Sequence, residues 1–130
     1  MKLRFYHCEV CGKTIAVFSD SDTPTDCCGY AMQELISGMT DGAAEKHIPV
    51  YRMDGSTLLV RVGSESHPMT DVHSICWVGL ETAQGFQFKE LHPGELPLAC
   101  FSICPEDEAR TVYAFCDLHG LWCAEVEGAA

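Results

Sequence analysis

The stretch FCDLHGLW, residues 115–122, contains two side chains that could bind a metal ion, Cys116 and His119. Thiolates and imidazoles are common ligands of transition metals. Three further histidines fall at turns or at the ends of short apolar runs: His47, His67 and His73. A lone histidine is more often a surface or hydrogen-bonded core residue than a ligand. The prediction of a metal site therefore rests on the five donors together.

Four imidazoles and one thiolate are more donors than zinc normally uses, since zinc sites close at four ligands. A five-donor set with one free position suits a redox-active ion such as ferrous iron in an octahedral frame. A thiolate opposite the free position would push electron density onto the ion, as it does in thiolate-ligated haem. Neutral imidazoles and a single thiolate would leave ferrous iron with a net positive charge, which attracts a small anion.

A second cluster of donors lies near the N-terminus, where CEVCG is followed by DCCGY. A C-x2-C turn points two sulfurs at one place, but adjacent cysteines on an extended strand face opposite ways. The chain must therefore turn sharply near Gly29 if all four thiolates are to bind one ion. A segment of about 36 residues rarely folds alone, so a tetrathiolate site with zinc or iron is predicted. A redox-active C-x-x-C pair or unrelated buried thiols are the alternatives.

Composition narrows the classes of function. The chain has 130 residues, 47% of them hydrophobic, which is enough for one ordinary domain and a small appendage. The formal net charge of −11 argues against nucleic acid or an anionic membrane as partner. Nine cysteines without a secretory signal favour metal binding over disulfides, and no apolar run is long enough to span a membrane. We therefore expect a cytoplasmic protein.

Short apolar or β-branched runs, separated by turn signals, recur about every ten residues after residue 47. Seven such runs at this spacing predict an antiparallel sandwich or barrel. The runs cover residues 48–53, 57–62, 73–81, 86–91, 97–104, 110–116 and 121–126. The preceding segment, residues 36–46, is rich in glycine and small residues and is predicted to be a linker.

The motifs CEVCG, CCG, EKHIPV, HPMTDVHSICW and CDLHGLW occur in the order and at the spacing of desulfoferrodoxin-type superoxide reductases, which the chain resembles over nearly its whole length. The resemblance implies an all-β chain. A small desulforedoxin-like domain, residues 1–37, would hold a tetracysteinyl iron or zinc centre. A seven-stranded immunoglobulin-like β-sandwich, residues 38–130, would hold a mononuclear non-haem iron. The implied metal ligands are Cys8, Cys11, Cys27, Cys28, His47, His67, His73, Cys116 and His119.

The same resemblance implies an activity, the one-electron reduction of superoxide to hydrogen peroxide. The four histidines would be equatorial ligands and Cys116 the axial one. Lys46 would draw superoxide in and help to protonate it, and Glu45 would cover the iron when it is ferric. A rubredoxin-like protein would donate the electron, the tetracysteinyl centre could relay it, and the chain would form a homodimer.

The sequence is also compatible with two other functions. One is a non-enzymatic electron-transfer iron protein, in which the second metal site is closed. The other is a zinc-stabilised adhesion or scaffold module, in which the β-sandwich binds the partner.

Two further features lie outside the implied ligand set. Asp117 follows Cys116 where the family often has asparagine, and a carboxylate pointing toward the thiolate would lower the reduction potential of the iron. Four cysteines match no ligand position and are predicted to be reduced and mostly buried strand thiols. They are Cys76, Cys100, Cys104 and Cys123.

Overall fold

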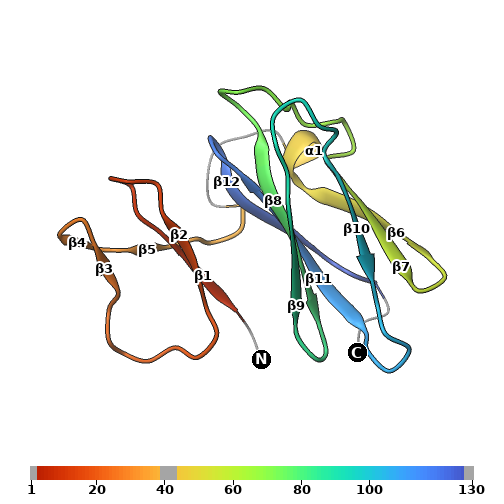
Figure 1. Ribbon diagram of the computed structural model, residues 1–130, viewed down its shortest axis with the longest axis horizontal. Helices are drawn as coiled ribbons and strands as arrows, with labels where there is room; N and C mark the ends of the chain where they lie inside the picture. The colour runs from red at the N-terminus through yellow and green to blue at the C-terminus, as the bar shows by residue number, and fades with distance from the viewer. Residues whose placement is uncertain (1–2, 39–43, 128–130) are drawn as a thin grey trace. The chain divides into compact units, whose positions relative to one another are not determined.

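The computed structural model describes residues 3–38 and 44–127, and Figure 1 shows the course of the chain. The chain divides into two compact units, and the division falls between Ile36 and Ser37. Part of the predicted linker, residues 39–43, lies outside the described residues. Its last part, however, is the single helical turn α1, Ala44–His47.

The N-terminal unit consists of short strands around a small apolar centre. One sheet has the order β2-β1-β5, with β1 Arg4–His7, β2 Thr14–Val17 and β5 Gln33–Glu34. The other is the hairpin of β3 Asp26–Cys27 and β4 Tyr30–Ala31. The buried hydrophobic side chains that the structure describes here are Leu3, Phe5, Cys8 and Met32. So little buried apolar surface supplies little of the free energy of folding.

The second unit is a β-sandwich. Among residues 44–127 the structure has seven strands, and all of them pair antiparallel. One sheet has the order β10-β7-β6 and the other has the order β12-β11-β8-β9. The prediction of an all-β chain with a seven-stranded sandwich is confirmed. The strands are β6 Pro49–Asp54, β7 Thr57–Val62, β8 Ile75–Thr82, β9 Phe86–Glu90, β10 Leu98–Ser102, β11 Ala109–Cys116 and β12 Gly120–Glu125.

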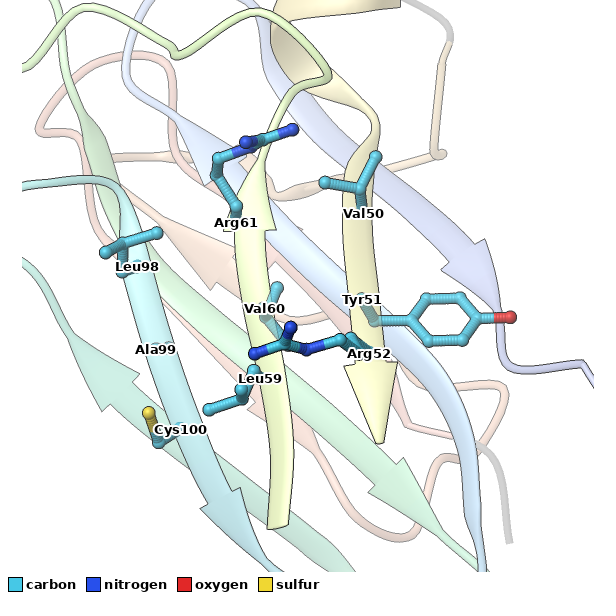
Figure 2. Close-up of a pocket in the computed structure, with 9 residues that line it drawn as sticks. All are labelled: Val50, Tyr51, Arg52, Leu59, Val60, Arg61, Leu98, Ala99 and Cys100. Carbon is cyan, nitrogen blue, oxygen red and sulfur yellow. The ribbon is translucent and has the colours of Figure 1, made fainter. Parts of the chain in front are cut away.

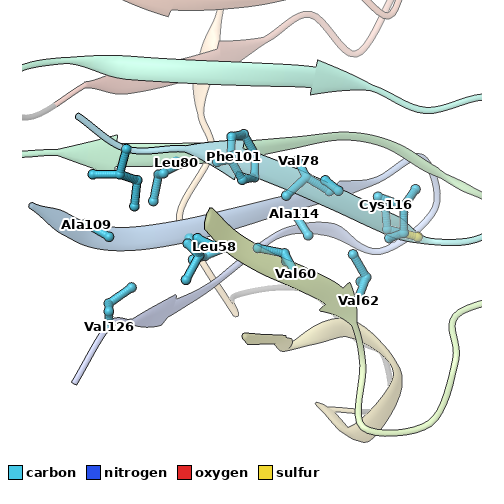
Figure 3. Close-up of a cluster of buried hydrophobic side chains, with 14 residues drawn as sticks. Leu58, Val60, Val62, Val78, Leu80, Phe101, Ala109, Ala114, Cys116 and Val126 are labelled. Atoms are coloured by element: carbon cyan, nitrogen blue, oxygen red, sulfur yellow. The ribbon is translucent and has the colours of Figure 1, made fainter. Parts of the chain in front are cut away.

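The core lies between the two sheets, because alternate side chains of each strand point inward. On β7, Leu58, Val60 and Val62 are buried, while Arg61 between them is exposed. Figure 3 shows side chains from strands of both sheets gathered in one cluster, which includes Phe101 of β10. Cys116 at the end of β11 belongs to this cluster, so the core continues up to one of the predicted ligands.

A β-bulge separates the regular part of the four-stranded sheet from the end that carries Cys116. Along β11 and β8, Phe115 pairs with Trp77, but Cys116 pairs with Ile75, so Cys76 has no register partner. A bulge of this kind bends the strand and redirects the side chains beyond it. Cys116 is thereby fully buried at the rim of the sandwich.

The four remaining cysteines are free thiols, as predicted, but the expectation that most are buried is wrong. Cys100 and Cys104 are exposed, and Cys76 and Cys123 are only partly buried. Cys100 is exposed because it alternates with the buried Ala99 and Phe101 on β10. Cys100 lines a groove on the outer face of the β10-β7-β6 sheet, beside Leu59 of β7 (Figure 2). None of the predicted metal ligands lines that groove.

Within the described ranges, no helix has the length and apolar composition that crossing a bilayer requires.

Candidate metal centres

The first candidate centre lies in the N-terminal unit, where the sulfurs of Cys8, Cys11, Cys27 and Cys28 all lie within 4.8 Å of one another. The Cys11 and Cys27 sulfurs are 3.6 Å apart, and those of Cys27 and Cys28 are 3.9 Å apart. Sulfurs bound tetrahedrally at about 2.3 Å from an ion lie about 3.8 Å from one another. The four thiols are free of disulfides. Their positions therefore fit a tetrathiolate metal site.

The backbone makes the turn that two adjacent cysteine ligands require. Cys28 has a φ of 54° and Gly29 a φ of 82°, so both lie in the left-handed region. Left-handed backbone at a non-glycine residue is strained, at about 1–3 kcal/mol. The left-handed conformation turns the Cys28 side chain so that the sulfurs of Cys27 and Cys28 face the same point. The sharp turn predicted near Gly29 is confirmed.

The electrostatics of the four thiols favour a bound cation. The backbone N–H groups of Cys11 and Val10 face the Cys8 sulfur and lower the pKa of that thiol to about 7. Neighbouring thiols, Cys11 foremost, raise the pKa values of Cys27 and Cys28. Thiols this close resist full deprotonation unless a positive ion neutralises them.

The second candidate centre lies in the β-sandwich unit. His47 Nε2 lies 3.1 Å from His67 Nε2 and 3.1 Å from His119 Nδ1. Cys116 Sγ lies 3.3 Å from His67 Nε2 and 3.9 Å from His119 Nδ1. The donor atoms of His47, His67, His73 and Cys116 all lie within 4.8 Å of one another. The structure thus brings together the five donors that the sequence analysis singled out.

A shared ion accounts for this cluster better than hydrogen bonds do. His47 Nε2 lies within reach of two other ring nitrogens, although one ring nitrogen either donates a single hydrogen or accepts. His73 Nε2 is buried and has no hydrogen-bond partner. Nitrogens bound at right angles, about 2.1 Å from an ion, lie about 3.0 Å apart, close to the 3.1 Å seen here. The donors therefore fit one metal ion.

His67 is held in the form that binds metal. Its Nδ1 lies 2.6 Å from the carbonyl oxygen of Pro68, which can only accept a hydrogen bond. Nδ1 therefore carries the proton, and the lone pair of Nε2 is directed toward the other donors. Burial lowers the pKa of His67 to about 4, so the ring is neutral at physiological pH.

A close backbone approach brings His67 beside His47. The turn after β7 begins at Gly63, with a φ of 86°, and the Gly63 N–H donates to the Ile48 carbonyl at 3.1 Å. A Cβ at Gly63 would clash with the Glu65 carbonyl oxygen and would lie 2.7 Å from the backbone carbon and oxygen of Lys46. Only glycine fits this approach without a shift of the backbone. The turn therefore packs directly against the backbone of helix α1, and this contact brings His47 and His67 together.

Trp122 positions two ligands, a role that the sequence analysis did not assign. Its ring stacks on the His47 ring, with centroids 5.0 Å apart and an interplanar angle of 26°. Its Nε1 donates a hydrogen bond of 2.9 Å to the carbonyl oxygen of His119. An indole three residues after a candidate ligand was visible in the sequence, but only the fold shows that it faces His47.

Two other candidate residues lie next to a ligand. Glu45 and Lys46 precede His47 on helix α1, and both are exposed.

His7 and His92 lie apart from the two donor clusters. His7 Nδ1 is 2.9 Å from the Thr14 hydroxyl, and His92 is exposed beside Glu90.

Comparison with known proteins gives the family. The family model described as desulfoferrodoxin matches residues 39–125, more than half of the chain. The chain belongs to the desulfoferrodoxin family. The desulfoferrodoxin of Syntrophotalea carbinolica is 38% identical over 125 residues, which are 95% of this chain and 97% of that protein. The desulfoferrodoxin of Nitratidesulfovibrio vulgaris is 38% identical over 121 residues, covering 92% of this chain and 94% of that protein.

Solved structures agree with this desulfoferrodoxin assignment. The superoxide reductase from Treponema pallidum is 34% identical and aligns with a TM-score of 0.81 over 95% of this chain and 99% of that one. The superoxide reductase from Giardia intestinalis is 30% identical, with a TM-score of 0.55, over 64% of this chain and 98% of that one. The family is iron-binding, and both donor clusters of this chain can bind metal.

Proposed function

We propose that the chain is a superoxide reductase, which reduces superoxide to hydrogen peroxide with one electron and two protons. The observation that carries this proposal is the convergence of four imidazoles and one thiolate in a desulfoferrodoxin whose solved structural neighbours are superoxide reductases. We take iron as the ion at the second centre, and iron or zinc at the four-cysteine centre. When bound, the iron supplies the electron that superoxide takes up.

The chain must first attract an anion, although its own net charge is −11. Lys46 is exposed and adjoins the ligand His47, so its ammonium group adds local positive charge beside the centre. Its Nζ can also hold a proton close to the reacting anion. Glu45, one residue earlier, would cover the centre after the product has left.

Cys116 would contribute the one anionic ligand of the second centre. Burial raises the pKa of its thiol, while the backbone N–H groups of His119 and Leu118 face the sulfur and favour the thiolate. An approaching cation strongly favours that thiolate. Because the Cys116 sulfur is buried and accepts backbone hydrogen bonds, solvent water has little access to it.

The reaction consumes an electron at each turnover, so an external one-electron reductant must supply it. We propose a rubredoxin-like donor, with the four-cysteine centre as a relay when it holds iron, and a homodimer in the cytoplasm. The rival function is an electron-transfer iron protein that does not react with superoxide.

One pair of variants tests the proposed function. Reduced wild-type protein should consume superoxide in a fast second-order reaction and form hydrogen peroxide without dioxygen. Cys116→Ser should abolish both this reaction and the visible thiolate-to-iron absorption of the second centre, because it removes the sulfur ligand. Pulse radiolysis with detection of the products measures the reaction, and elemental analysis gives the iron content.

Cys28→Ser is the matched control, since it removes one sulfur from the other centre. It should lose the N-terminal metal and retain superoxide reduction. A wild-type protein with iron at both centres that leaves superoxide unreacted would instead favour the electron carrier. A Cys116→Ser variant with the wild-type rate would also overturn the proposal.

A further inference from the structure

Two hydrogen bonds join the segments that carry His73 and Cys116. Asp117 directly follows Cys116, and its N–H donates to the carbonyl oxygen of Ser74 at 3.1 Å. In return, the N–H of Ser74, directly after His73, donates to Asp117 Oδ1 at 3.0 Å. A side-chain oxygen thus takes the place that a strand carbonyl would have in an antiparallel ladder. We call this ring of two hydrogen bonds the Asp117–Ser74 clasp.

The clasp lies at a point where regular pairing has just been interrupted. The register of β8 and β11 shifts between Phe115 and Cys116. Cys116 pairs with Ile75 directly after the shift, and the clasp is the next pairing. Without the clasp, the pairing of Cys116 with Ile75 would be the last contact between β8 and β11 at this end of the sheet. The clasp therefore restrains the residues that hold His73 and Cys116 at their mutual position.

The clasp also places a carboxylate one residue from the sulfur ligand. An anion near a metal ion stabilises the oxidised, more positive state more than the reduced state. Asp117 is exposed, so water and salt screen part of this effect. Its hydrogen bond to Ser74, however, holds the carboxylate in one position rather than free in solvent.

We propose that Asp117 is a positioning residue that fixes the His73 and Cys116 segments through Oδ1, and that its negative charge lowers the reduction potential of iron at this centre. The inference rests on the proposed function only in taking iron as the ion. The change concerned is the addition of one electron from an external one-electron donor to ferric iron, which gives ferrous iron. A lower potential favours transfer to superoxide and requires a more strongly reducing donor.

Two substitutions separate the hydrogen bond from the charge. Asp117→Asn keeps a side-chain oxygen that can accept from the Ser74 N–H but removes the charge, whereas Asp117→Ala removes both. Asp54→Asn is the matched control, because it removes the same charge at the opposite end of β6 from His47. The midpoint potential of the His/Cys centre is measured by redox titration of the visible absorption in full-length protein, and iron affinity by competition with a chelator.

We expect a positive shift of the potential in both Asp117 variants and no shift in Asp54→Asn. Asp117→Ala should also bind iron about tenfold more weakly, as is typical when a group that supports a metal ligand is removed. Asp117→Asn should bind it as the wild type does.

An unchanged potential in Asp117→Asn would overturn the role of the charge. Loss of iron from Asp117→Asn would overturn the role of Oδ1, because asparagine keeps the acceptor. Both readouts are independent of superoxide. If Asp117→Asn shows the positive shift relative to the wild type but the wild type does not react with superoxide, the proposed function is refuted and this inference stands.

Discussion

In the N-terminal unit, four sulfurs come from two short turns, and three of the four cysteines are exposed or only partly buried. In the β-sandwich unit, the donors come from segments as far apart in sequence as His47 and His119. There, His47, His67 and Cys116 are fully or almost fully buried beside a continuous core. The first centre is a local structure with little core beneath it, whereas the second is assembled by a fold that has its own hydrophobic stabilisation.

Because of this difference, a bound metal ion would contribute differently to the folding of each unit. Local turns cannot hold four thiols together by apolar packing, so the ion must contribute to folding. The sandwich already fixes its ligands by backbone contacts, such as that of Gly63 with Ile48, and by the stacking of Trp122 on His47. The fold of this unit would therefore not depend on the ion that its donors bind.

Removal of metal should have the largest effect and should distinguish the two units. A chelator under reducing conditions is expected to unfold the strands β1 to β5, because a tetrathiolate ion contributes on the order of 10 kcal/mol to folding. The strands β6 to β12 should remain folded, since their core does not include the metal. Hydrogen exchange, measured by mass spectrometry on peptides from each unit, reports separately whether the strands β1 to β5 unfold and whether the strands β6 to β12 stay folded. Equal loss of protection in the two units would contradict the comparison.

The periodic features of this molecule were predictable from the sequence. The seven strands of the sandwich follow from alternating apolar residues and turn signals, and the sharp turn near Gly29 follows from two adjacent cysteines that share one ion. Donor types and motif order were enough to name the ligand candidates. The exposure of Cys100 was not predicted, because a cysteine in an apolar run can occupy either face of a strand.

What the sequence could not supply are contacts between distant segments. The stacking of Trp122 on His47 depends on how β12 passes helix α1. The clasp between Asp117 and Ser74 depends on a register shift of a single residue. No local pattern encodes either, since both arise from the packing of strands that are far apart along the chain.

Substitution of Gly63 tests whether the fold itself positions the second centre. Gly63→Ala places a methyl group against the backbone of Lys46 and Glu65, at a residue with left-handed backbone, at an expected cost of about 3 kcal/mol. Because His67 follows this turn, iron affinity at the second centre should fall as well. Urea unfolding monitored by tryptophan fluorescence gives the stability, since both tryptophans lie in the sandwich unit.

Gly55→Ala is the matched control for that substitution. Gly55 also has a left-handed φ, of 63°, but a Cβ there would have no heavy atom within 4 Å. The control should therefore cost only about 1 kcal/mol and leave iron binding unchanged. Equal effects of the two substitutions would mean that left-handed strain, and not the contact with helix α1, determines the stability.

The smallest expected effect concerns the positive charge of Lys46, beside the ligand His47 of the second centre. Lys46→Ala is expected to slow the second-order reaction with superoxide about tenfold and to weaken its dependence on ionic strength. Lys46→Arg should retain most of the rate, because the charge is kept. Arg110→Ala removes one positive charge at the opposite end of β11 from Cys116 and should leave the rate nearly unchanged. Pulse radiolysis at several salt concentrations measures all four proteins. If Arg110→Ala slows the reaction as much as Lys46→Ala, the net charge of the chain, and not a local charge beside His47, controls the approach of the anion.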